Sequence, residues 1–123
     1  MHIERTQKAR FSTSGQVTLS GAGYGVVRLA PLGEEWEIDS YTVSVSTNTL
    51  EAICNVYQRQ MIKTNIVDFT PAGSTGAVSD TVLYHADGEA LYFEWTGGDA
   101  AAVATVTVRG WKTLPARGFR AVS

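Results

Sequence analysis

The stretch from residue 88 to residue 110, GEALYFEWTGGDAAAVATVTVRG, decides the fold class of this chain. Leu91, Phe93 and Trp95 occupy alternate positions before the turn, and Val and Thr alternate after it. Alternation with a period of two is typical of a half-buried β-strand. Because the Gly97-Gly98-Asp99 turn lies between two such runs, the sequence predicts a β-hairpin here.

The same pattern recurs in short runs along the chain, separated by turn residues. The predicted strands are 16–20, 24–30, 36–46, 50–60, 64–69, 81–84, 90–95 and 101–111. Eight short strands without βαβ alternation predict an all-β fold, a single antiparallel β-sandwich of jelly-roll type. Trp36 and Ile38 fall on even positions, whereas Tyr41 and Val43 fall on odd ones, so a β-bulge is expected near residues 39–40.

The length of 123 residues predicts one domain with one core. We expect an extended N-terminal arm over 1–14, a sandwich domain over 15–112, a C-terminal arm over 113–123, and a loop over 70–80. No apolar run approaches the roughly 20 residues that span a bilayer, and the N-terminus lacks the apolar core of a signal peptide. Cys54 is the only cysteine, which fits folding in a reducing cytoplasm without a disulfide.

Charge is divided between the ends and the body of the chain. Residues 1–15 and 109–123 hold seven Lys or Arg residues against one acid, whereas 16–108 holds three against eleven acids. Opposite signs suit the ends for docking on the body of the same chain or of a neighbouring copy. Nucleic-acid binding is disfavoured, because the few basic residues lack interleaved aromatics and the acidic body repels phosphate.

Candidate catalytic and metal-binding groups are sparse. His2 and His85 are the only histidines, and His85 lies in a turn, which predicts a hydrogen-bonded surface side chain. Cys54 falls between Ala52 and Val56 on an apolar face, which indicates a buried thiol. Acids that a glycoside hydrolase would need occur in two groups, Glu34, Glu35, Glu37 and Asp39, and Glu89 and Glu94. Their alternation with apolar residues favours an ordinary solvent-facing strand, so no enzyme, metal or cofactor is expected.

The aromatic residues divide into core and surface candidates. Trp95 and Trp36 share the phase of the buried positions and are expected in the core. Tyr24, Tyr92 and Trp111 lie on the opposite phase or near an end. These side chains would stack on a sugar ring in a binding module, or anchor an interface in an assembly.

The chain resembles a group of small β-sandwich virion proteins of tailed phages that infect actinobacteria. The resemblance covers about residues 24–112, and its longest motifs are Glu94-Trp95-Thr96-Gly97-Gly98-Asp99-Ala100 and Ala104-Thr105-Val106-Thr107-Val108-Arg109-Gly110. The remaining matches are Gly33-Glu34-Glu35-Trp36, Val43-Ser44-Val45-Ser46-Thr47, Cys54-Asn55-Val56-Tyr57 and Gly88-Glu89-Ala90-Leu91. The resemblance implies a multi-copy, non-catalytic accessory role on the tail or the capsid, and it transfers no functional residue.

The sequence therefore predicts a structural protein of a phage virion, made in the host cytoplasm and in contact with its own copies and other virion proteins. The predicted interface residues are Arg5, Lys8, Arg10, Trp111, Lys112, Arg117, Phe119 and Arg120. Their expected counterparts are acids such as Glu34, Glu35, Glu37 and Asp39. The main alternative is a carbohydrate-binding module for a host-surface glycan, with Tyr24 and Tyr92 as its platform; a hydrolase is a third. Head or tail location, copy number and the partner protein stay open.

Overall fold

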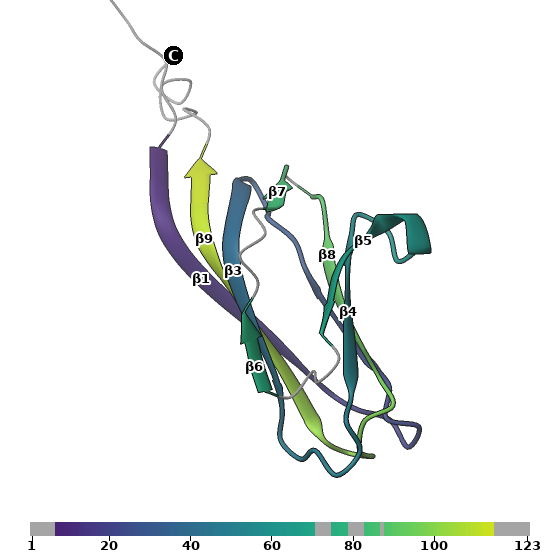
Figure 1. Ribbon diagram of the computed structural model, residues 1–123. Helices are drawn as coiled ribbons and strands as arrows, with labels where there is room; N and C mark the ends of the chain where they lie inside the picture. The colour runs from purple at the N-terminus through teal and green to yellow at the C-terminus, as the bar shows by residue number, and fades with distance from the viewer. Residues whose placement is uncertain (1–6, 71–74, 79–82, 87, 115–123) are drawn as a thin grey trace, which may run out of the picture.

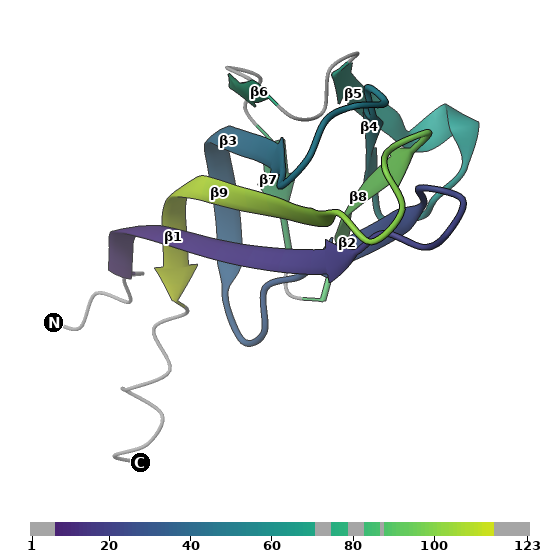
Figure 2. The ribbon, with the colours of Figure 1, turned by 90° about the horizontal axis from the view of Figure 1, so that it is seen from below.

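The computed structural model describes residues 7–70, 75–78, 83–86 and 88–114, and they form an all-β structure of two antiparallel sheets. Sheet A has the order β1-β9-β3-β6, and β7 also pairs with β3. Its strands are β1 (Gln7–Thr18), β9 (Val103–Leu114), β3 (Glu35–Val45), β6 (Thr75–Val78) and β7 (Leu83–His85). Sheet B has the order β2-β8-β4-β5. Its strands are β2 (Gly25–Leu29), β8 (Leu91–Thr96), β4 (Ile53–Gln58) and β5 (Ile66–Thr70), the last preceded by a 3₁₀ turn, η1 (Lys63–Asn65). The two sheets form two layers (Figures 1 and 2).

The predicted alternation builds one core between the layers. Leu91, Phe93 and Trp95 on β8 are fully buried, and their neighbours on β8 are only partly buried. Tyr41 of sheet A meets Phe93 of sheet B edge to face, with 5.3 Å between ring centres. The predicted core positions Trp36 and Cys54 are buried as well. These observations confirm the sequence-based core, and they place one inner face of each sheet against the other.

The predicted bulge is confirmed in β3. The register of β3 against β9 shifts between Ile38 and Ser40, so Asp39 has no partner in that pairing. Opposite the bulge, a Cβ added to Gly110 would collide with the backbone carbonyl of Glu37. A glycine at this position is what allows the two backbones to approach so closely.

The predicted N-terminal arm is wrong for the part of it that the structure describes. Residues 7–14 belong to β1, which pairs with β9 over its whole length, from Gln7 opposite Leu114 to Thr18 opposite Val103. Phe11 is the one large apolar residue of this segment, and the centre of its ring lies 5.1 Å from the centre of the Trp36 ring. The sequence signal was weak because the other positions are small or polar, while the backbone pairing with β9 is what orders them. At the other end, β9 extends to Leu114, so the sheets reach beyond the predicted 15–112 boundaries; 1–6 and 115–123 lie outside the described residues.

The hairpin predicted at Gly97-Gly98-Asp99 is also wrong, because β8 belongs to sheet B and β9 to sheet A. The segment crosses between the sheets instead. The Gly98 N–H donates to the Gly23 carbonyl at 3.1 Å. The Asp99 carboxylate accepts the N–H groups of Thr49 and Leu50, both at 2.8 Å, and these bonds lower the pKa of Asp99.

The central region differs from the prediction in one further way. The predicted 70–80 loop contains β6, a strand of sheet A, although 71–74 and 79–80 lie outside the described residues. The described part of the chain thus has nine strands rather than the eight predicted, and β6 and β7 both lie beside β3. Among the described residues, no helix is long and apolar enough to cross a membrane.

Candidate functional site

The outer face of sheet A carries a group that we call the Trp111 cluster: Lys8, Arg10, Glu37, Asp39 and Trp111. In the strand register, Trp111 of β9 lies between Arg10 of β1 and Glu37 of β3. Lys8 Nζ lies 5.5 Å, and the Arg10 guanidinium carbon 5.0 Å, from the centre of the Trp111 ring. Lys8 pairs with Glu37 at 3.3 Å, and Arg10 donates to Asp39 at 2.8 Å. Each cation thus reaches over the indole ring to an acid two strands away.

In the Trp111 cluster, basic residues of the N-terminal segment bind acids of the body within one chain. This is one of the two predicted forms of docking, the other being contact with a neighbouring copy. The acids of the cluster, Glu37 and Asp39, were two of the predicted counterparts, but they bind cations of their own chain. The cation side chains are 52% and 53% exposed, so each ion pair contributes only about 0–1 kcal/mol. The cluster therefore links β1, β9 and β3 only weakly across their outer face, and an interface role for its residues stays a prediction.

The other predicted interface residues do not join this cluster. Lys112 lies on β9 opposite Ala9 and Trp36, on the alternate side of the strand from Trp111. Arg5, Arg117, Phe119 and Arg120 lie outside the described residues. The acid Glu34 accepts a hydrogen bond of 2.6 Å from the Trp36 indole N–H of its own chain.

The outer face of sheet B carries a second group, the Glu94 cluster, which consists of Tyr24, Asn55, Tyr57 and Glu94. The Tyr57 hydroxyl donates to Glu94 Oε1 at 2.9 Å, and the Tyr24 hydroxyl donates to Oε2 at 3.0 Å. The Asn55 amide lies 3.5 Å from Oε1. Burial, and then the hydrogen bond to the Glu94 carboxylate, raise the pKa of both tyrosines. One carboxylate is thus held by three neutral donors from two segments of the chain, Tyr24 before β2 and Asn55 and Tyr57 on β4.

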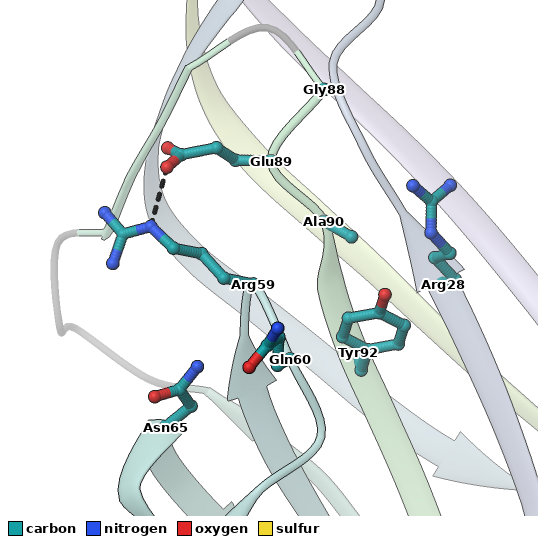
Figure 3. A pocket seen from close by; sticks show the side chains of 8 residues that line it. All are labelled: Arg28, Arg59, Gln60, Asn65, Gly88, Glu89, Ala90 and Tyr92. Atoms are coloured by element: carbon teal, nitrogen blue, oxygen red, sulfur yellow. Dashed lines mark hydrogen bonds and ion pairs between the residues drawn. The ribbon is translucent and has the colours of Figure 1, made fainter.

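Tyr92 lies beside the Glu94 cluster at the rim of an open pocket of about 380 Å³ (Figure 3). In the register of sheet B, Tyr92 stands between Arg28 of β2 and Tyr57 of β4. The pocket lining combines this ring with cationic, amide and small side chains. The other lining residues are Arg28, Arg59, Gln60, Asn65, Gly88, Glu89 and Ala90.

The charges of this pocket are partly paired. Arg59 Nε donates to Glu89 Oε2 at 2.6 Å, as the dashed line in Figure 3 marks. The other oxygen, Oε1, accepts the Ala86 N–H at 2.8 Å, so both carboxylate oxygens are engaged. The bond from Arg59 is the main reason why the pKa of Glu89 is lowered. Arg28 is exposed and forms no ion pair with any described residue.

The two tyrosines predicted as a ligand platform take different positions. Both lie on the sheet B side of the molecule, but Tyr92 lines the pocket and Tyr24 does not. The Tyr24 hydroxyl is instead bonded to Glu94, and the side chain is 43% exposed. Tyr57 was not singled out from the sequence, and Glu94 was named only as a candidate acid, although their alternation with buried neighbours on β4 and β8 placed both on the outer face.

The prediction of a surface His85 is wrong, because the residue is 1% exposed at the end of β7. Neither ring nitrogen forms a hydrogen bond within the described structure. Burial lowers the pKa of His85, and the nearby Glu89 opposes this shift to a smaller extent. A second pocket, of about 250 Å³, adjoins His85 and shares Arg59 and Glu89 with the first.

Among the described residues, no group of three or more His, Cys, Asp or Glu side chains is placed to hold a metal ion. Cys54 is buried and forms no disulfide. Comparison with known proteins adds no assignment: no family model matches the sequence, and no curated protein matches it either.

Proposed function

We propose that this chain is a non-enzymatic structural protein of a phage virion, an accessory tail or capsid-decoration protein present in many copies. We also propose that its architecture is a jelly-roll sandwich with eight strand positions, in which β6 and β7 share the position beside β3. Jelly rolls are two-sheet folds that recur in viral capsid and lectin domains. Because a fold alone does not fix a function, the proposal also rests on the sequence resemblance over residues 24–112.

The observation that carries the jelly-roll proposal is the nesting of the strand pairs. The first and last strands pair, β1 with β9, and the second and second-last pair, β2 with β8. Inside them, β3 pairs with β6 and β7, and β4 pairs with β5. With β6 and β7 counted as one partner of β3, these four nested pairs alternate between sheet A and sheet B along the chain. This pattern arises when one long antiparallel ribbon wraps around a core.

Quantitative mass spectrometry of purified particles tests the virion proposal. Phage particles from a host that expresses the gene are purified on a density gradient, and the chain is quantified against the major capsid protein. We expect the chain to comigrate with the particles in several copies per particle. Its presence in the soluble lysate and absence from the particles would contradict the proposal.

A carbohydrate-binding module is the second candidate, and the pocket of about 380 Å³ that Tyr92 lines favours it. An aromatic face beside amide and guanidinium groups suits a sugar, because the ring covers the apolar sugar face and the polar groups bind hydroxyls. We expect saturable binding in a glycan screen to be lost in Tyr92→Ala and kept in Tyr24→Ala, which leaves the pocket lining intact. Equal loss in both variants, or no binding by the native chain, would remove this candidate.

A further inference from the structure

β1 is the long open edge of sheet A. Its twelve residues pair with β9 on one side, and no described strand pairs with it on the other. Figure 1 shows β1 running as one long curved strand along the border of the sheet, and Figure 2 shows it from below. An edge of this kind presents unpaired backbone N–H and C=O groups to any second strand.

Charged side chains normally keep an edge strand from pairing with another chain, but on β1 they are few and are bound to acids of the same chain. Lys8 and Arg10 are the only charged residues of β1, and both are paired with acids of β3 in the Trp111 cluster. Residues 11–18 carry no charge at all, and neither proline nor a charged side chain interrupts them. Charged residues and prolines are the usual means by which an edge strand resists pairing.

We propose that β1 pairs with β1 of a second copy, antiparallel and related by a twofold axis perpendicular to sheet A. This contact rests on the proposed multi-copy role and deepens it by naming the surface and its occupant. A twofold axis makes the contact self-complementary, and it joins the two sheets A into one continuous sheet.

The alternation of β1 restricts the register of this contact. Phe11, Thr13 and the other odd positions through Val17 are half-buried, whereas Ser12 and the other even positions through Thr18 are exposed. Residues directly opposite in an antiparallel pair point to the same face of the sheet, so inner positions must meet inner positions. Each pair of opposite residues is therefore odd with odd or even with even.

The register that centres on Thr13 suits the side chains best. It places Thr13 opposite the same residue of the second copy and Phe11 opposite Gly15, so that the largest apolar side chain of β1 faces a residue that has no side chain. It places Arg10 opposite Gln16, and no two like charges face one another. The two neighbouring allowed registers, centred on Ser12 and on Ser14, set Phe11 opposite the side chains of Thr13 and Val17 instead.

Charge substitutions on the exposed face of β1 test this contact. In the proposed register Ser12 of one copy faces Ser14 of the other, twice per dimer. Like charges directly opposite destabilise a strand pair, so S12K/S14K should raise the dimer dissociation constant about tenfold. S12K/S14E sets opposite charges face to face and should lower it. Both positions are exposed, and circular dichroism checks that each variant folds.

Sedimentation equilibrium over a concentration series measures these constants. E51K is the matched control, because it changes the net charge by as much as S12K/S14K at an exposed residue outside β1; it should leave the constant unchanged. A monomeric native chain, equal constants for the two double variants, or an equal effect of E51K would overturn the β1 contact. Since particle mass spectrometry is independent of this measurement, a chain abundant in particles but insensitive to these variants would keep the virion role and lose the contact.

Discussion

The outer faces of the two sheets hold their charged groups in different ways. On sheet A, the Trp111 cluster balances two cations against two acids across a partly buried indole ring. On sheet B, the Glu94 cluster holds a single carboxylate with neutral hydroxyl donors, of which the Tyr57 hydroxyl belongs to a side chain only 9% exposed. Exposed ion pairs are weak because water competes for them, whereas a buried donor that loses its acceptor is costly. Stability should therefore depend more on the Glu94 cluster than on the ion pairs of the Trp111 cluster.

The largest effect is expected where the backbone beneath the Trp111 cluster is tightest. Gly110→Ala would drive a Cβ into the Glu37 carbonyl at the β3 bulge. The clash can be removed only if β9 and β3 move apart, so we expect a loss of about 3 kcal/mol in the free energy of unfolding. Urea unfolding measures this loss, and Gly21→Ala, where an added Cβ meets no atom within 4 Å, is the control. Equal stability of the two variants would show that the strands are not packed as described.

The next effect concerns the Glu94 cluster directly. Glu94→Ala leaves the Tyr57 hydroxyl without its acceptor, and we expect unfolding free energy to fall by about 2 kcal/mol. Glu94→Gln keeps an acceptor oxygen at the same place and should lose less. The two variants are compared by urea unfolding at neutral pH. A loss as large in the Gln variant as in the Ala variant would mean that the negative charge, and not the hydrogen bond, stabilises the cluster.

A smaller effect is expected from His85, which lies on neither outer face. Burial lowers its pKa in the folded chain below the ordinary 6.5 of the unfolded chain. As the pH falls, the unfolded chain therefore takes up the proton before the folded chain does. The contribution of His85 to the free energy of unfolding is complete above pH 6.5 and is lost as the pH falls from 6.5 toward the folded pKa. His85→Gln should flatten this part of the profile of unfolding free energy against pH, and His2→Gln should not. If His85→Gln left the profile of unfolding free energy against pH unchanged, the loss of stability at low pH would have to come from other groups.

The smallest effect is expected from an ion pair of the Trp111 cluster. A double-mutant cycle of Arg10→Gln and Asp39→Asn should give a coupling of about 0.5 kcal/mol at low salt and less at high salt. The cycle is measured by urea unfolding at both salt concentrations. A coupling well above 1 kcal/mol would place this pair on a level with the Glu94 cluster and erase the contrast between the two faces.

Local patterns in the sequence predicted the core and failed at the connections. The alternation of Leu91, Phe93 and Trp95 identified their burial, and the phase change at Asp39 identified the bulge. The Gly97-Gly98-Asp99 turn was misassigned because glycine and aspartate suit both a hairpin and a crossing between sheets. The choice depends on distant partners, Gly23 and the Thr49–Leu50 backbone, which no local pattern shows.

The candidate sites were predicted only in part, because the residues that meet in them are distant from one another in the sequence. Charge segregation indicated that the basic ends would meet the acidic body, but it did not show that Lys8 and Glu37 lie on one sheet, separated by Trp111. Tyr92 was identified as a surface aromatic from its phase alone. The amide and guanidinium groups that surround it come from three other segments, and only the folded chain brings them together.

The measurement that tests the account most directly is the solution mass of the native chain by light scattering at low and at high salt. Because the cations of β1 are paired within the chain and the proposed contact is a backbone pairing, we predict the same concentration-dependent dimer at both salt concentrations. A dimer that dissociates at high salt would contradict the account, since it would indicate ionic docking between copies. A monomer under both conditions would contradict self-association through β1 altogether.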